Sequence, residues 1–175
     1  MNHKFILLLI IFLTFGSFSY PQQTDDSKKA KFYNDLMTAE IPIVNQKKII
    51  KLKDFEDKVI VVIFLASWCT PCVQQAKDLR EIKTEFQKNN LFILGLNGDS
   101  EDKKDFQSFL KVTKFNYLMG FAKDNLVESL VSVSRKDAIP QTIIIHNGEI
   151  KEIYVGGGKT IEKVRKTLNE IFDKK

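Results

Sequence analysis

A pair of cysteines two residues apart follows a long run of β-branched residues, and this order limits what the chain can fold into. Residues 59–65 have the continuous apolar character of a strand that is buried on both faces. Cys69 and Cys72 come next, and apolar residues then recur at helical spacing up to about Lys88. A second buried strand is predicted over 91–96. Because there is no room for a hairpin, strand, helix and strand are expected to form a parallel βαβ unit.

A helical insert and a ββα unit are predicted to complete one α/β domain. Apolar residues recur on one helical face after Asp99 and again after Asp124. Asn147-Gly148 is a tight-turn signal between two apolar strands, and an amphipathic pattern follows Gly156–Gly158. The expected elements are helices over about 100–112 and 124–131, strands over 142–145 and 149–155, a helix over about 161–171 and, before the βαβ unit, a hairpin over 41–52.

Composition allows one ordinary domain and argues against nucleic-acid binding. The chain has 175 residues, of which 43% are hydrophobic, enough for a real core. Its formal net charge of +5 is spread over segments of mixed sign. The densest basic stretch, residues 47–53, has no interleaved aromatic residue that could stack on a base. We therefore expect no nucleic-acid partner.

The first 19 residues have the pattern of a secretory signal. Lys4 precedes an apolar run over 5–13, and the small residues Ser17 and Ser19 suit cleavage before Tyr20. An uncleaved anchor is the alternative, although the run is shorter than the roughly 18–20 apolar residues of a spanning helix. No cysteine lies near this site, so the protein is not expected to be a lipoprotein. We expect a periplasmic or extracytoplasmic protein.

The chain is predicted to consist of three segments. Residues 1–19 are predicted to be the signal peptide or anchor, and residues 20–35, which are polar and rich in lysine, a flexible leader. Residues 36–175 are predicted to form the single folded domain.

The spacing of the two cysteines favours a redox role over a purely structural one. A disulfide between Cys69 and Cys72 closes too small a loop to stabilise the fold much, and two cysteines cannot complete a four-ligand zinc site. At a helix N-terminus the Cys69 sulfur would face unpaired N–H groups, which lower a thiol pKa from about 8.5 to about 7 or below. Its thiolate could attack a disulfide, and Cys72, one turn later, could then release the mixed disulfide.

The residues beside the cysteines are candidates for tuning them. Pro71 suits the first helical turn, where a missing N–H costs little, and Thr70 and Pro71 are both expected to influence the reduction potential. Trp68 is expected to shield one side of the site, and a plain core aromatic is its alternative interpretation.

The motif Trp68-Cys69-Thr70-Pro71-Cys72, with Ile139-Pro140 before a later strand, resembles the thioredoxin superfamily. The segment 41–68 is similar to the opening of TlpA/ResA-like exported reductases, which include cytochrome c maturation proteins, and the helical insert is similar to theirs. The resemblance covers about residues 40–173. It implies a thioredoxin-like α/β fold, with a central mixed β-sheet flanked by helices, an N-terminal β-hairpin extension, and the insert between the βαβ and ββα halves.

The resemblance also implies roles for two further residues. Pro140 would be the cis-proline that faces the disulfide and holds off metal ions and wrong thiols. The backbone of Ile139 would pair with an extended substrate chain.

Three positions depart from the family pattern. Ile63 stands where thioredoxins carry a buried acid, Gln75 where ResA-like proteins place a glutamate, and Lys77 where many relatives have a proline. Without either carboxylate, no internal base is evident for Cys72. We hypothesise that its proton moves through water or the substrate thiol, which would make reduction slower or less dependent on pH.

The sequence thus predicts an extracytoplasmic thiol–disulfide oxidoreductase, and the favoured interpretation is a reductase that acts on exported proteins. We expect it to be a monomer that needs no cofactor and no metal. A membrane electron donor of the thiol-reducing type would recharge it. An oxidase or isomerase is the second possibility, because direction depends on the reduction potential. A copper chaperone that uses Cys69, Cys72 and His146 is the non-enzymatic alternative, although His146 beside the hairpin turn is better explained as an exposed turn residue.

Overall fold

A five-stranded mixed sheet forms the centre of the computed structural model, which describes residues 25–44, 46–98 and 103–173. The strand order is β5-β4-β3-β6-β7. The first three of these strands are mutually parallel, whereas β6 runs antiparallel to both β3 and β7. The strands are β3 (Val59–Leu65), β4 (Leu91–Asn97), β5 (Leu118–Phe121), β6 (Gln141–His146) and β7 (Glu149–Val155). The predicted thioredoxin-like arrangement is confirmed.

The environment of the central strand β3 explains its continuous apolar sequence. All seven residues are buried, and alternate residues face two separate apolar clusters. Val61 and Ile63 belong to one cluster, and Ile60 and Val62 to the other. A strand with a core on each face has no position for a polar side chain, which is why its apolar run is continuous.

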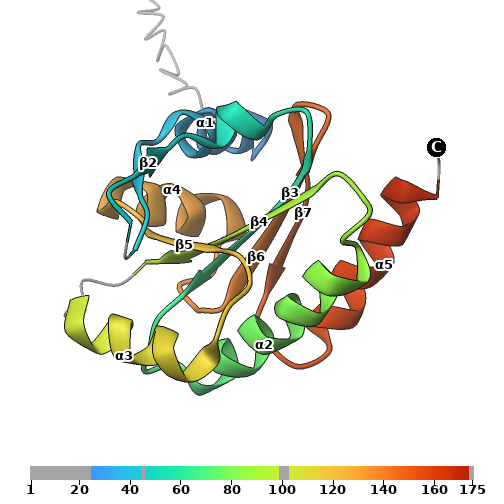
Figure 1. Ribbon diagram of the computed structural model, residues 1–175. Coiled ribbons are helices and arrows are strands. Elements are labelled where there is room, and N and C mark those ends of the chain that lie inside the picture. The colour runs from blue at the N-terminus through green and yellow to red at the C-terminus, as the bar shows by residue number, and fades with distance from the viewer. Residues whose placement is uncertain (1–24, 45, 99–102, 174–175) are drawn as a thin grey trace, which may run out of the picture.

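Helices cover both faces of this sheet (Figure 1). One cluster joins the sheet to residues of α2, α3 and α5, and the other joins it to residues of α1 and α4. This arrangement confirms the predicted βαβ unit, helical insert and ββα unit. The helices are α1 (Asp25–Thr38), α2 (Thr70–Glu85), α3 (Lys103–Thr113), α4 (Asp124–Ser134) and α5 (Thr160–Phe172), with a short 3₁₀ helix, η1 (Leu52–Phe55).

The prediction of a flexible leader over 20–35 is wrong from residue 25 onward, because α1 begins there. Phe32, Leu36 and Met37 of this helix are buried in the cluster shared with α4. The guanidinium of Arg135, just after α4, donates to both carboxylate oxygens of Asp25 at 2.6 Å. Residues 25–35 therefore pack as part of the folded domain, ahead of the predicted boundary at residue 36.

The predicted hairpin is confirmed with very short strands, β1 (Ile41–Pro42) and β2 (Ile49–Ile50), which pair antiparallel. It lies against β5, a strand that is not among the predicted elements. A Cβ atom on Gly120 of β5 would come within 2.6 Å of the Ile41 side chain and 3.0 Å of the Pro42 carbonyl oxygen. The glycine is therefore required by the close approach of the hairpin.

The predicted signal peptide over 1–19, residues 20–24 of the predicted leader and residues 100–102 of the predicted insert helix lie outside the described residues. In the part of the chain that the structure describes, no helix combines the length and the apolar character needed to cross a membrane.

Candidate active site

The N-terminus of α2 places the two cysteines just beyond the carboxyl end of the central strand β3. Cys69 is the N-cap residue, with extended backbone, and its sulfur accepts a hydrogen bond from the backbone N–H of Cys72 at 3.3 Å. Pro71 lies in the first turn, as predicted, where its missing N–H leaves no gap in the helix. Cys69 therefore has its sulfur at the positive end of the helix dipole.

The two cysteines form a disulfide in this structure. Their sulfurs are bonded, and the Cα atoms lie 5.2 Å apart. Cys72 is fully buried, whereas Cys69 keeps 4% of its surface exposed. Cys69 is thus the sulfur that a partner could reach.

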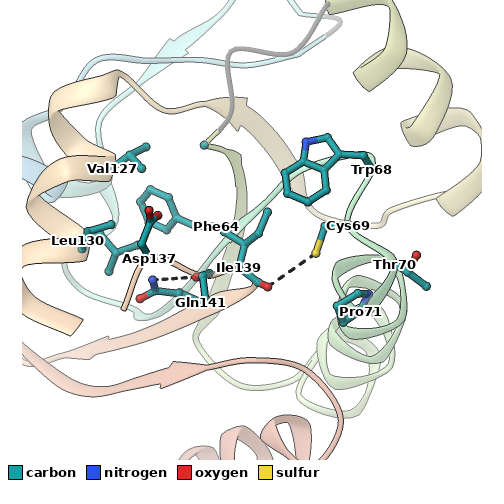
Figure 2. Close-up of a pocket in the computed structure, with 13 residues that line it drawn as sticks. Phe64, Trp68, Cys69, Thr70, Pro71, Val127, Leu130, Asp137, Ile139 and Gln141 are labelled. Carbon is teal, nitrogen blue, oxygen red and sulfur yellow. Dashed lines mark hydrogen bonds between the residues drawn. The ribbon is translucent and has the colours of Figure 1, made fainter. Parts of the chain in front are cut away.

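The loop before β6 brings the next two predicted residues to the disulfide. The Ile139–Pro140 peptide bond is cis, as the family resemblance implied. The carbonyl oxygen of Ile139 lies 3.8 Å from the Cys69 sulfur, as the dashed line in Figure 2 shows. The side chain of Gln141 holds this loop in place by donating to the carbonyl oxygens of Lys136 and Ala138.

A cavity of about 510 Å³ opens beside Cys69. Figure 2 shows Trp68 and Cys69 on one side of it, and the α4 residues Val127 and Leu130 on the other. Its lining is mainly apolar, and Asp137 is the one charged residue among the described residues that line it. An extended polypeptide could place an apolar side chain here while its disulfide contacts Cys69.

Trp68 does not belong to the core. Its side chain is 66% exposed and lines the cavity next to Cys69, which excludes the core-aromatic alternative. Thr70 and Pro71 are exposed beside the disulfide and line the same cavity.

Gln75, by contrast, lies on the buried face of α2, one turn after Cys72. It is only 1% exposed, and its Nε2 donates to the Oγ1 of Thr142 on β6 at 2.5 Å. Ile63 is opposite Thr142 in the sheet and is fully buried. Every buried polar side chain among the described residues is an amide or a hydroxyl, so none of them can act as an acid or base near neutral pH.

One further part of the site, the loop after β7, is absent from the predicted site residues. Its glycine run, residues 156–158, indicates by its pattern only the end of a strand. In the structure, Gly157 packs so closely on Pro71 that a Cβ there would lie 3.1 Å from the proline Cβ. A glycine run before the last helix could have indicated such a close backbone approach.

His146 lies at the wrong end of the molecule for a copper site shared with the two cysteines. It ends β6, whereas Gln141 begins that strand next to the disulfide, so roughly 17 Å of strand separates the two. Cys69, Cys72 and His146 therefore cannot bind one metal ion.

Comparison with known proteins agrees with this geometry. Residues 34–153 match the AhpC/TSA family. The thiol-disulfide oxidoreductase ResA of Oceanobacillus iheyensis is 25% identical over 170 residues, which cover 95% of this chain and 85% of the relative.

Two solved structures share the fold. A thiol:disulfide interchange protein from Bacteroides sp. superimposes with a TM-score of 0.60 at 19% identity, covering 76% of this chain and 88% of that one. A secreted Mycobacterium tuberculosis disulfide oxidoreductase homologous to E. coli DsbE superimposes with a TM-score of 0.61 at 12% identity, covering 75% of this chain and 94% of that one. The chain is thus a thiol–disulfide oxidoreductase of thioredoxin fold and belongs to the AhpC/TSA family.

Proposed function

We propose that this protein reduces disulfides of exported proteins, with Cys69 as the attacking residue and Cys72 as the resolving residue. The observation that carries the proposal is the hydrogen bond from the Cys72 N–H to the Cys69 sulfur at the start of α2. In the reduced protein the same N–H stabilises a Cys69 thiolate, the species that attacks disulfides.

The reaction consumes one dithiol for each disulfide reduced. The Cys69 thiolate attacks one substrate sulfur, forms a mixed disulfide and displaces the other substrate sulfur as a thiolate. Cys72 then loses its proton and attacks the Cys69 sulfur. The bond between Cys69 and the substrate breaks, the Cys69–Cys72 disulfide forms, and the second substrate thiol leaves. Two electrons pass to the substrate, and a thiol donor at the membrane returns them.

Ile139 and the cavity supply the binding face in this proposal. The Ile139 backbone, next to the Cys69 sulfur, pairs with an extended substrate strand, and Pro140 in its cis form keeps that backbone turned toward the disulfide. An apolar side chain of the substrate enters the cavity between Trp68 and Leu130. Cysteine-bearing apoproteins of cytochrome c are one substrate class that this arrangement suits.

The place of action rests on the sequence and on the relatives. The apolar run over 5–13 suits export, and the related M. tuberculosis oxidoreductase is a secreted protein. In a compartment where disulfides form readily, a reductase needs a steady supply of electrons, which is why we propose a membrane donor.

Insulin reduction, followed by turbidity with dithiothreitol as the electron source, tests the direction of the reaction. We expect rapid precipitation with the wild type and none above background with Cys69→Ser. The Cys72→Ser variant should instead accumulate mixed disulfides with extracytoplasmic proteins, which a thiol reagent releases. A wild type that oxidises reduced peptides but does not reduce insulin would overturn the reductase proposal in favour of an oxidase.

A further inference from the structure

One atom of the buried Gln75 amide has no partner. Its Nε2 donates to Thr142, but its Oε1 is buried and accepts no hydrogen bond. Among the described residues only the Oε1 of Gln141 shares this state. Buried amide oxygens are normally paired, because leaving an acceptor unsatisfied costs its full desolvation free energy.

The fold places Gln75 one turn after Cys72 on the buried face of α2. Gln75 follows Cys72 by three residues, so the two side chains lie on the same face of α2, and helical side chains lean toward the N-terminus. Thr142 pairs with Ile63, which belongs to the same cluster as Cys72, so its hydroxyl also points toward α2. The Gln75 side chain therefore reaches from the face of α2 that carries Cys72 to β6, with its nitrogen engaged by Thr142 and its oxygen unpaired.

We propose that Gln75 is a positioning residue whose Oε1 accepts a hydrogen bond from the Cys72 thiol once the disulfide is reduced. In the disulfide, Cys72 has no proton to donate, and the oxygen stays unpaired. Reduction adds two electrons to the sulfurs and, with Cys69 held as a thiolate, one proton, which resides on Cys72 and supplies the missing donor. The inference rests on the redox activity of the pair and does not depend on which substrates it serves.

This hydrogen bond would change the balance between the two redox states. Because the unpaired oxygen burdens only the disulfide form, the dithiol form is favoured and the reduction potential is higher than with an apolar residue at position 75. The bond also holds the Cys72 proton until resolution. As Cys72 attacks the Cys69 sulfur, this proton passes to the departing substrate sulfur, directly or through water.

The potential of Gln75→Met tests the first consequence. Methionine has a similar length but no amide, so both the unpaired oxygen and its proposed bond disappear. At equilibrium with glutathione we expect the variant to favour its disulfide about tenfold more than the wild type, a fall of about 30 mV. Gln74→Met is the matched control, since Gln74 is exposed on the same helix and bonds Asp78. Its potential should not move, and an unchanged potential in Gln75→Met would overturn the proposal.

The infrared S–H stretch tests the bond directly. In the reduced Cys69→Ala variant, Cys72 carries the only remaining thiol. We expect its S–H band below the frequency of an unbonded thiol, with a return to that frequency when Gln75→Met is added. A band at the unbonded position in Cys69→Ala alone would sink the proposal, even if the double variant did not fold. Failure to reduce insulin would leave both measurements intact, so the two proposals can fail separately.

Discussion

The backbone N–H of Gly156 donates a hydrogen bond of 2.8 Å to the carbonyl oxygen of Pro140. The loop after β7 is thereby tied to the cis-proline loop, while its next residue, Gly157, packs on Pro71 at the start of α2. Three segments that are far apart in the sequence therefore fix one another around the disulfide. The position of the Ile139 carbonyl beside Cys69 depends on this mutual support.

Gly156→Ala should slow insulin reduction beyond what its loss of unfolding free energy explains. Gly156 has φ +92°, which costs a residue with a side chain roughly 1–2 kcal/mol of unfolding free energy. Gly148→Ala is the control, because Gly148 has φ +76° but lies in the hairpin turn at the other end of β6. We expect similar losses in urea denaturation for both, but a slower insulin reduction for Gly156→Ala alone. Equal rates would show that the loop does not support the site.

Gln75→Glu should make disulfide reduction more dependent on pH. Burial raises the pKa of a carboxyl at this position above the usual value of about 4.3, and its ionised form can then take the Cys72 proton. We expect a pH–rate profile with one inflection more than the wild type and a faster rate on its alkaline side. Because the folded-state pKa is raised, stability is retained at low pH and falls as the pH rises through the carboxyl titration. Identical profiles would contradict the proton route inferred for the wild type.

Asp137 should favour substrates with a basic residue near the disulfide. Its carboxylate is the charged group of the described cavity lining, and an exposed ion pair contributes about 0.2–1 kcal/mol, up to about fivefold in KM. Matched peptide disulfides that carry lysine or glutamate beside the cysteine measure this preference. The wild type should prefer lysine, and Asp137→Asn should lose that preference, whereas Asp54→Asn, in η1, should keep it. A preference unaffected by Asp137→Asn would refute the role of this carboxylate.

The buried strands β3, β4 and β6 of the central sheet could be predicted because their residues have no alternative environment, whereas the short strand β5 was not predicted. A strand such as β3, buried on both faces, needs an unbroken apolar run, and the turn Asn147-Gly148 shows a left-handed backbone at both positions, as its sequence indicated. The position of Cys69 at the start of α2 could also be predicted, because apolar residues recur at helical spacing directly after the two cysteines.

What could not be predicted depends on contacts between distant segments. The buried stripe of α1 consists of only three residues in a lysine-rich segment, and its packing depends on α4, about 90 residues later. Phe32 and Leu36 are four residues apart, a spacing that hinted at a helix. The orphaned oxygen of Gln75 is likewise visible only once β6 is placed beneath α2.

Phe32→Ala should destabilise the domain strongly. Phe32 is fully buried in α1, and removal of a buried phenylalanine ring typically costs about 3–5 kcal/mol of unfolding free energy. Asn34→Ala, at an exposed position of the same helix, should change stability by less than about 0.5 kcal/mol. Chemical denaturation distinguishes this from the flexible leader, for which both substitutions would be neutral.

Tyr117 should make the fold sensitive to alkaline pH. Burial raises the pKa of its hydroxyl above the ordinary value of 10, against a smaller lowering effect of Arg80, and the hydroxyl donates to the Ala76 carbonyl at 3.0 Å. Its contribution to stability is therefore present below pH 10 and is lost as the pH rises further, because the unfolded chain releases the proton first. Unfolding at several pH values should show a steeper alkaline decline for the wild type than for Tyr117→Phe. Parallel losses of stability in the wild type and Tyr117→Phe would contradict this role of Tyr117.

The exposed position of Trp68 next to the disulfide gives the protein a built-in optical reporter. It is the only tryptophan in the chain, so all indole fluorescence comes from the residue directly before Cys69. A nearby disulfide quenches indole emission far more than a dithiol does. Each turnover should therefore be visible as a change in brightness, without any label attached to the protein.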